Sequence, residues 1–305
     1  MNALCKWLAP MMLAVVAAGC ESTTEPAPTK PVHSKPAPSN SSAVPRLRST
    51  LAGIERLAIG SRTPLTDAQL FVPGRFAPDA TGNVPLYLHF QGGVTIAEEN
   101  FARMQRPGVL IASTIQGRSS AFSRPYANPA AFRSLLESAE HRLSTQFERE
   151  LRFDPIVITF FSAGYGAVRE LLKEPEFFDR IDALVSADSI YASVVHPDVR
   201  APLAEHMVDF LRFAQAAVRG DKTFVLAHGM YATDYASTSE CADLILASVA
   251  GRRVASGEFT KRGVPISSAF HQRGMHLYTF DENTAAFHVD CLYMIPDLVR
   301  RHVRH

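Results

Sequence analysis

The sequence predicts an α/β protein with a mainly parallel central sheet and helices on both faces. Short runs that are apolar throughout alternate along the chain with stretches in which apolar residues recur every three or four positions. A strand buried on both faces is apolar throughout, and an amphipathic helix repeats at that spacing. Right-handed crossovers then bring the carboxyl ends of the parallel strands to one edge, where a functional site is expected.

Each expected strand is short and ends in residues typical of turns. The expected strands are Val84–Phe90, Val109–Thr114, Ile156–Phe161, Ile181–Ala187, Phe224–Ala227 and His276–Phe280. Helix starts between them carry capping signals. The expected helices begin at the capping boxes Thr95/Glu98 and Ser237/Glu240, at Asn128-Pro129, at Pro202 and near Thr284. The segments Gln116–Asn128 and Val194–Pro202 are expected to be loops that line the site.

Residues 1–20 have the pattern of a secretory signal, because Lys6 precedes an apolar core that is too short to span a bilayer. The ending Ala17-Ala18-Gly19-Cys20 resembles the lipobox of bacterial lipoproteins, which implies a lipid on Cys20. We therefore expect a protein that is lipid-anchored in a bacterial cell envelope. Glu21 favours the outer membrane, since lipoproteins retained in the inner membrane tend to carry an Asp there. An ordinary cleaved signal with an incidental cysteine is the alternative.

Residues 21–46 are rich in Pro, Ser and Thr and contain almost no large apolar side chains. Such a segment buries too little surface to offset the entropy lost on ordering, so it is expected to be a disordered tether. Residues 47–305 are expected to form one folded domain.

The composition excludes several classes of protein. Lys and Arg number 31 against 30 Asp and Glu, and no basic stripe appears, which argues against a nucleic-acid binder. A hydrophobic content of 47% argues against a disordered regulator. The chain has neither an H-E-x-x-H nor a C-x-x-C motif, so neither a metal nor another cofactor is expected. Cys241 and Cys291 fit either a disulfide or two buried free thiols.

The segment that carries the most chemistry follows the expected strand Ile156–Phe161. The strand runs directly into Ser162-Ala163-Gly164, and a helical pattern leaves this turn at once. A nucleophile elbow needs small residues beside its serine, because strand and helix approach closely there. Phe160 stands where the G-x-S-x-G pattern has its first Gly, which is a departure from the motif.

This segment resembles the elbow of the α/β-hydrolase superfamily, and the resemblance extends over residues 65–305. It implies that Ser162 is the nucleophile, followed in the chain by an acid and then a histidine. Asp188, directly after the strand Ile181–Ala187, and Asp234, one strand later, are the candidate acids. His288, after the last strand, is the expected base. His228, at a strand end, is the second choice.

The segment Gln91-Gly92-Gly93 follows the expected strand Val84–Phe90 and resembles the glycine-rich oxyanion loop of that superfamily. The resemblance implies that backbone N–H groups of this segment and of Ala163 hold the oxyanion. Gln91 stands where a Gly is expected, which is a second departure from the pattern.

The resulting hypothesis is a serine hydrolase that cleaves a small-molecule or polymer carboxylic ester through an acyl-enzyme. The first alternative is an inactive hydrolase-fold lipoprotein that acts as a binding or interaction module, which the departures at Phe160 and Gln91 favour. The second is a degenerate phosphate-binding turn at Ser162–Ala167, with Asp188 as the ribose acid. Arg169 spoils the glycine spacing of this second alternative.

Overall fold

A computed structural model describes residues 59–196 and 198–304. The expected signal peptide with Cys20, the expected tether 21–46 and the first residues of the expected domain 47–305 lie outside the described residues. Among the described helices, none has both the length and the apolar character needed to cross a membrane.

A ten-stranded mixed sheet forms the centre of the described region, in the order β1-β2-β4-β3-β5-β6-β9-β12-β11-β10. Neighbouring strands from β4 to β12 are parallel, while the strands at both edges are antiparallel. The strand bounds are β1 Gly60–Leu65, β2 Ala68–Pro73, β3 Asn83–Phe90, β4 Val109–Ser113, β5 Arg152–Phe161, β6 Ile181–Ala187, β9 Thr223–His228, β10 Val254–Ala255, β11 Ser268–Gln272 and β12 Met275–Thr279. The hairpin of β7 (Val194–His196) and β8 (Val199–Pro202) stands apart.

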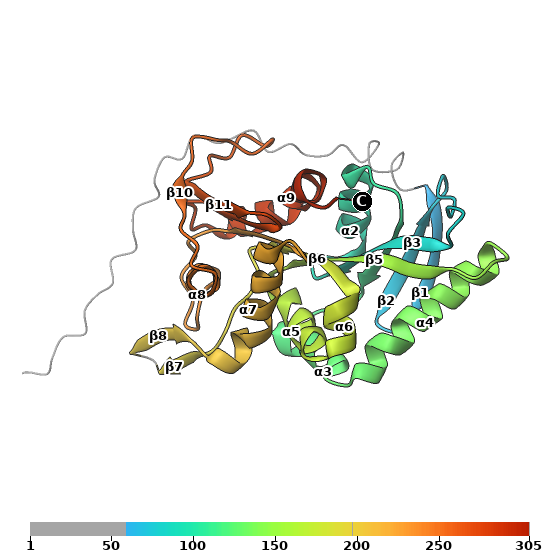
Figure 1. The fold of residues 1–305 in the computed structure, drawn as a ribbon, viewed down its shortest axis with the longest axis horizontal. Helices are drawn as coiled ribbons and strands as arrows, with labels where there is room; N and C mark the ends of the chain where they lie inside the picture. Colours follow the sequence, from blue (N-terminus) through green and yellow to red (C-terminus); the bar gives the residue numbers. More distant parts are fainter. Residues whose placement is uncertain (1–58, 197, 305) are drawn as a thin grey trace, which may run out of the picture. The chain divides into compact units, whose positions relative to one another are not determined.

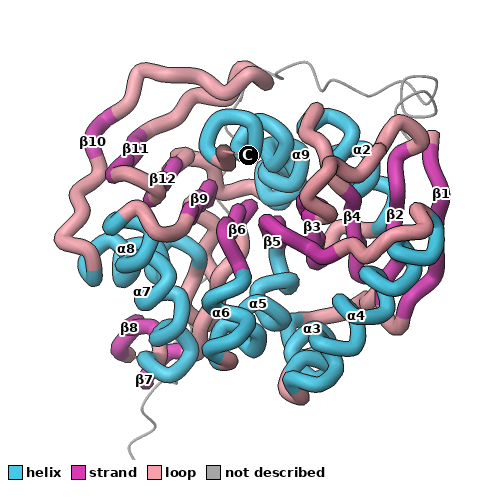
Figure 2. The backbone as a smooth tube through the Cα atoms, turned by 45° about the vertical axis from the view of Figure 1, so that its right-hand side comes forward, coloured by secondary structure: helices cyan, strands magenta, loops and turns pink. Residues whose placement is uncertain are grey.

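Helices cover both faces of the sheet, as expected for a mainly parallel α/β fold (Figures 1 and 2). Helices α2 (Val94–Met104) and α9 (Ala285–His302) lie together on one face, where the Asn100 side chain donates a 2.8 Å hydrogen bond to the Leu292 carbonyl. The other helices lie on the opposite face. They are α3 Ser119–Tyr126, α4 Pro129–Gln146, α5 Tyr165–Lys173, α6 Pro175–Arg180, α7 Ala204–Arg219 and α8 Thr238–Ser248.

Two hydrophobic clusters hold these layers together, one on each face of the sheet. Phe101 and Leu292 belong to the cluster beneath α2 and α9, and Leu171 and Phe210 to the cluster on the other face. Phe160 is fully buried in the second cluster. The bulky residue at this departure from the elbow pattern is therefore part of the core.

The strand order places a switch in direction between β3 and β5. The chain passes from β3 to β4 through α2 on one face, whereas it passes from β5 to β6 through α5 and α6 on the other face. At such a point the two helices diverge and leave a crevice at the carboxyl ends of the strands. Gln91 follows β3 and Ser162 follows β5, so both lie at the carboxyl ends of the strands where the direction switches.

Several local expectations need correction. Glu98 forms no capping box with Thr95, because it pairs with Arg62 and Gln69 instead, and α2 begins at Val94 after Gly93. The helix expected from Pro202 is present as α7, but it begins two residues later, at Ala204, because Pro202 ends strand β8. The expected loops contain structure as well. The segment Gln116–Asn128 contains α3, and Val194–Pro202 forms the β7–β8 hairpin.

Other capping signals are confirmed. Asn128 caps α4, with its side chain accepting from the Ala130 N–H, and Ser237 and Glu240 form the reciprocal capping box of α8. Thr284 caps α9. This last cap fixes where the final helix begins and thereby places His288 in its first turn.

Candidate active site

The turn after β5 has the geometry of a strained elbow. Ser162 has φ +48°, a left-handed backbone conformation that residues other than glycine rarely adopt. A Cβ atom added to Gly164 would lie 2.5 Å from the Phe90 carbonyl oxygen, so only glycine allows this approach of α5 to β3. A non-glycine residue in such a backbone conformation costs about 1–3 kcal/mol and is typical of functional sites.

Asp188 follows β6 and is almost fully buried, at 1% exposure. Its carboxylate accepts three hydrogen bonds, from the Gly229 N–H at 3.1 Å, the Thr238 hydroxyl at 2.9 Å and His288 Nδ1 at 2.6 Å. Burial by itself raises the pKa of this carboxyl group, but the bonds from His288, Thr238 and Gly229 outweigh it and lower the pKa. Asp188 is therefore ionised at neutral pH.

His288 lies in the first turn of α9, and its side chain is 24% exposed. Because an ionised carboxylate only accepts, Nδ1 must carry the proton that is donated to Asp188. The other ring nitrogen, Nε2, is then the basic one. The His288 ring also contacts the Phe161 ring, with centroids 4.6 Å apart.

Ser162 lies beside the turn that contains Asp188. Strands β5 and β6 pair in parallel with Phe161 opposite Ala187, so Ser162 and Asp188 are the next residues of two neighbouring strands. The Ser189 hydroxyl donates a 2.6 Å hydrogen bond to the Ser162 carbonyl and ties the two turns together. No hydrogen bond joins the Ser162 hydroxyl to the His288 ring within 59–196 and 198–304. Such bonds are often long before substrate binds.

The expected oxyanion loop follows β3, the strand next to β5, and so lies beside the elbow. Phe90 pairs with Phe160, so Gln91 leaves β3 beside the turn that contains Ser162 and Ala163. Gln91, Gly92 and Gly93 have φ values of +69°, +113° and +88°. Gly92 also contacts α9, because an added Cβ atom would lie 2.8 Å from a methyl group of Leu292.

Three features together identify the fold. They are the strand order, the elbow after β5, and the acid after β6 that pairs with a histidine in the final helix. This is an α/β-hydrolase fold.

Solved structures with similar backbones include an enterobactin hydrolase, 14% identical, with a TM-score of 0.41 over 78% of this chain and 93% of that chain. Enterochelin esterase from Shigella flexneri is 12% identical, with a TM-score of 0.45 over 79% of this chain and 58% of that chain. A carboxylesterase from Bacillus subtilis is 12% identical, with a TM-score of 0.42 over 83% and 93% of the two chains. No protein-family model and no curated protein matches the sequence.

The alternative base and the alternative acid, His228 and Asp234, do not join the Asp188–His288 pair. His228 is buried, with Nδ1 2.9 Å from the Gly229 carbonyl oxygen and Nε2 3.2 Å from the Thr279 hydroxyl. Burial, helped by the charge of Arg253, lowers the pKa of His228, so it is neutral and enclosed. Asp234 is exposed, and no hydrogen bond joins it to either histidine in the described part of the chain.

The alternative of a phosphate-binding turn at Ser162–Ala167 receives no support from the structure. Gly164 and Gly166 are packed against the carbonyl groups of Phe90 and Ser119, and both carboxylate oxygens of Asp188 already have partners. No group of His, Cys, Asp and Glu side chains suited to a metal occurs among the described residues. Cys241 and Cys291 are buried free thiols, so the disulfide is not formed.

Sequence reasoning missed the residues that surround the acid. Ser189 and Thr238 hold the Ser162 turn and the Asp188 carboxylate, and the Gly229 N–H completes the set. The only sequence signal for either residue is its position. Ser189 is the neighbour of Asp188, and Thr238 follows the helix cap Ser237. Their bonds to residues 27 and 50 positions away depend on tertiary contacts that no local pattern indicates.

Proposed function

We propose that this protein is a serine hydrolase that cleaves carboxylic esters with Ser162, His288 and Asp188. The observation that carries the proposal is the 2.6 Å contact of His288 Nδ1 with the buried Asp188 carboxylate, beside an elbow whose serine has φ +48°. An ionised acid that fixes the histidine tautomer is what a serine needs in order to lose its proton during attack.

The reaction begins when His288 Nε2 takes the proton of the Ser162 hydroxyl as its oxygen attacks the acyl carbonyl carbon. The tetrahedral intermediate collapses, the C–O bond to the alcohol breaks, and His288 returns the proton to the departing alkoxide. Water then attacks the acyl-enzyme, again giving a proton to His288. The carboxylic acid leaves and Ser162 recovers its proton. Asp188 stabilises the imidazolium that forms in each half of this sequence.

Backbone N–H groups are proposed to hold the oxyanion. The candidates are those of the Gln91–Gly93 loop and of Ala163, at the start of the short helix that runs into α5. The first N–H groups of a helix have no partner within it, so they can point at a developing negative charge. One such donor is worth about 3 kcal/mol in kcat.

We further propose that Cys20 carries a lipid that anchors the protein in a bacterial envelope. The support is the sequence Ala17-Ala18-Gly19-Cys20 after a short apolar core. Radiolabelled palmitate should enter the wild-type protein, and Cys20→Ala should prevent this and release the protein from the membrane fraction. Unchanged incorporation into the variant would refute lipidation at Cys20.

Hydrolysis of simple esters by the purified protein tests the enzymatic proposal. Wild-type protein should release acid from phenyl acetate in a pH-stat, and Ser162→Ala should lower kcat by at least about a thousandfold. Turnover retained in Ser162→Ala would refute the serine mechanism. A folded wild-type protein without turnover would favour the alternative, a hydrolase-fold binding module, which the departures from the motif at Phe160 and Gln91 also favour.

A further inference from the structure

Three tyrosines form a continuous row of rings beside the candidate site. The Tyr165 and Tyr191 ring centroids are 5.5 Å apart, and those of Tyr191 and Tyr235 are 5.4 Å apart. Tyr165 and Tyr191 are each 9% exposed, whereas Tyr235 is 48% exposed. The row, which we call the tyrosine row, therefore has two rings in the protein interior and one at the surface.

The tyrosine row is built on the same turns as the catalytic candidates. Tyr165 lies three residues after Ser162, and the Tyr191 hydroxyl donates a 3.3 Å hydrogen bond to the Asp188 carbonyl oxygen. The segment that ends in Tyr235 begins at Gly229, whose N–H binds the Asp188 carboxylate. The exposed ring of Tyr235 thus belongs to the surroundings of the candidate nucleophile and acid.

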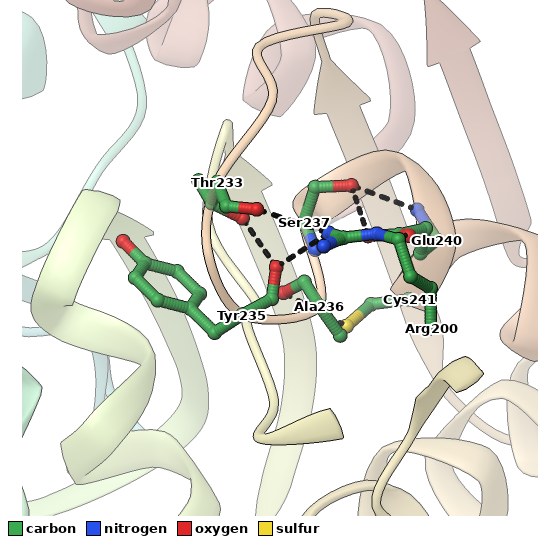
Figure 3. Close-up of polar contacts among 7 residues, drawn as sticks. All are labelled: Arg200, Thr233, Tyr235, Ala236, Ser237, Glu240 and Cys241. Atoms are coloured by element: carbon green, nitrogen blue, oxygen red, sulfur yellow. Dashed lines mark hydrogen bonds and ion pairs between the residues drawn. The ribbon is translucent and has the colours of Figure 1, made fainter. Parts of the chain in front are cut away.

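Tyr235 is held in place although it is exposed. Ala192 and Ala236 form an antiparallel bridge with N–O distances of 3.3 and 2.9 Å, which sets Tyr235 against Tyr191. Arg200, on β8, donates to the carbonyl oxygens of Thr233 at 3.0 Å and Tyr235 at 2.9 Å (Figure 3). In this view the Tyr235 ring points away from the Arg200 contacts.

Arg200 is itself fixed by a bidentate ion pair with Glu240, at 2.6 and 2.9 Å. The hydrogen bond from Arg200, with further bonds from Ser237, lowers the pKa of Glu240 to about 2, so the pair is charged at neutral pH. Because Glu240 also belongs to the capping box of α8, the β7–β8 hairpin and α8 both anchor the segment that carries Tyr235.

An exposed aromatic ring held by its backbone loses little conformational entropy when a ligand binds. A second ring placed on it gains an edge-to-face contact of the kind that Tyr191 and Tyr235 already make. Resting on the proposed function, we infer that Tyr235 binds an aromatic ring of the ester substrate and that Arg200 is its positioning residue. The ring belongs to either the acyl or the alcohol part of the ester.

Four esters in two matched pairs test this inference. Methyl benzoate against methyl cyclohexanecarboxylate probes the acyl part, and phenyl acetate against cyclohexyl acetate probes the alcohol part. Each substrate is compared between wild type and variant, so differences in intrinsic reactivity cancel. Tyr235→Ala should lower kcat/KM for the aromatic member of one pair or both by about tenfold. The cyclohexyl esters should change by less than about twofold.

Variants of the same loop separate ring binding from general disturbance. Tyr235→Phe keeps the ring and should retain kcat/KM within about threefold. Tyr231→Ala is the matched control, because Tyr231 has the same 48% exposure and makes no ring contact within the described residues, and it should change every ester by less than about twofold. Arg200→Ala should act in the direction of Tyr235→Ala, and the double variant should lose less than the sum of the two free-energy changes.

A loss in Tyr235→Ala that is equal for aromatic and cyclohexyl esters, or no loss in a protein that hydrolyses them, would overturn the inference and leave the proposed function intact. Additive effects of Arg200→Ala and Tyr235→Ala would overturn the positioning role. A wild-type protein that hydrolyses none of the four esters, and whose Ser162 does not react with a fluorophosphonate, would overturn the proposed function and the inference together.

Discussion

Asp188 and His288 are 100 residues apart in the chain, yet their side chains meet at 2.6 Å in a partly buried site. The acid leaves the end of β6, and the histidine lies in the first turn of α9, whose start Thr284 fixes by capping. The acid is held on its other oxygen by a backbone N–H and a hydroxyl group. A pair so fixed has one tautomer, and this leaves His288 Nε2 as the basic nitrogen.

Asp188→Asn should remove most of the activity and leave the fold intact. The amide cannot hold His288 in the tautomer that leaves Nε2 basic, so kcat should fall by about 10³–10⁴-fold. Because the pKa of Asp188 is lowered on folding, the ionised group stabilises the protein above its ordinary pKa, near 3.8, and this stability is lost as the pH falls through the lower folded value. Urea unfolding should show a smaller wild-type advantage over Asp188→Asn at pH 3 than at pH 7.

Replacing each of the two histidines in turn separates the base from its alternative. His288→Ala should lower kcat by about a thousandfold or more, and because it also removes a partner of the buried Asp188 carboxylate, cooperative urea unfolding is the check that the variant is folded. His228→Ala removes the partner of Thr279 and a bond to Gly229, so it should destabilise the protein by about 2 kcal/mol and change kcat by less than about tenfold. The reverse pattern in kcat would make His228 the base.

Gly164→Ala should destabilise the protein by about 3 kcal/mol or more, because the new methyl group would meet the Phe90 backbone at 2.5 Å. The Phe90 backbone cannot shift without disturbing the sheet, since β3 and β5 are central strands. Gly257→Ala is the control, as nothing lies within 4 Å of its added Cβ atom. Equal stability of the two variants in urea unfolding would show that the elbow is less tightly packed than described.

Acidification should destabilise the protein partly through His89. Burial lowers the pKa of His89 from 6.5 to about 4, so below pH 6.5 the unfolded chain takes up a proton that the folded one does not. Stability is therefore lost as the pH falls from about 6.5 to about 4, with a loss of about 2 kcal/mol at pH 5. His89→Gln should reduce the fall in unfolding free energy between pH 7 and pH 5 by that amount, and the exposed His141→Gln should not.

The parallel half of the fold was predictable from the sequence because its strands are apolar throughout. The strand at Ile181–Ala187 was predicted with the bounds observed, and the others agree to within a few residues. The antiparallel strands β1, β2, β10 and β11 were missed. β1, β10 and β11 are largely exposed or short, and β2, although mostly buried, has an apolar run of only three residues, Leu70 to Val72. Glu98 shows why the capping box at Thr95 failed, because a distant Arg62 competes for its carboxylate.

Part of the candidate site was predictable for a similar reason. Ser162, Asp188 and the Gln91–Gly93 loop follow strands whose ends a parallel sheet brings to one edge, and His288 follows from the start of the last helix. The choice between Asp188 and Asp234 needed the tertiary structure, because both follow apolar strands. The ring contacts of Tyr235 depend on the bridge between Ala192 and Ala236, which joins two irregular segments.

Labelling with a fluorophosphonate probe tests most directly whether Ser162 is an activated nucleophile. Wild-type protein should form one covalent adduct, located by peptide mass spectrometry at Ser162, and Ser162→Ala should not react. Asp188→Asn should react far more slowly, because the acid activates the serine through His288. A wild-type protein that unfolds cooperatively but takes up no probe would contradict the serine mechanism.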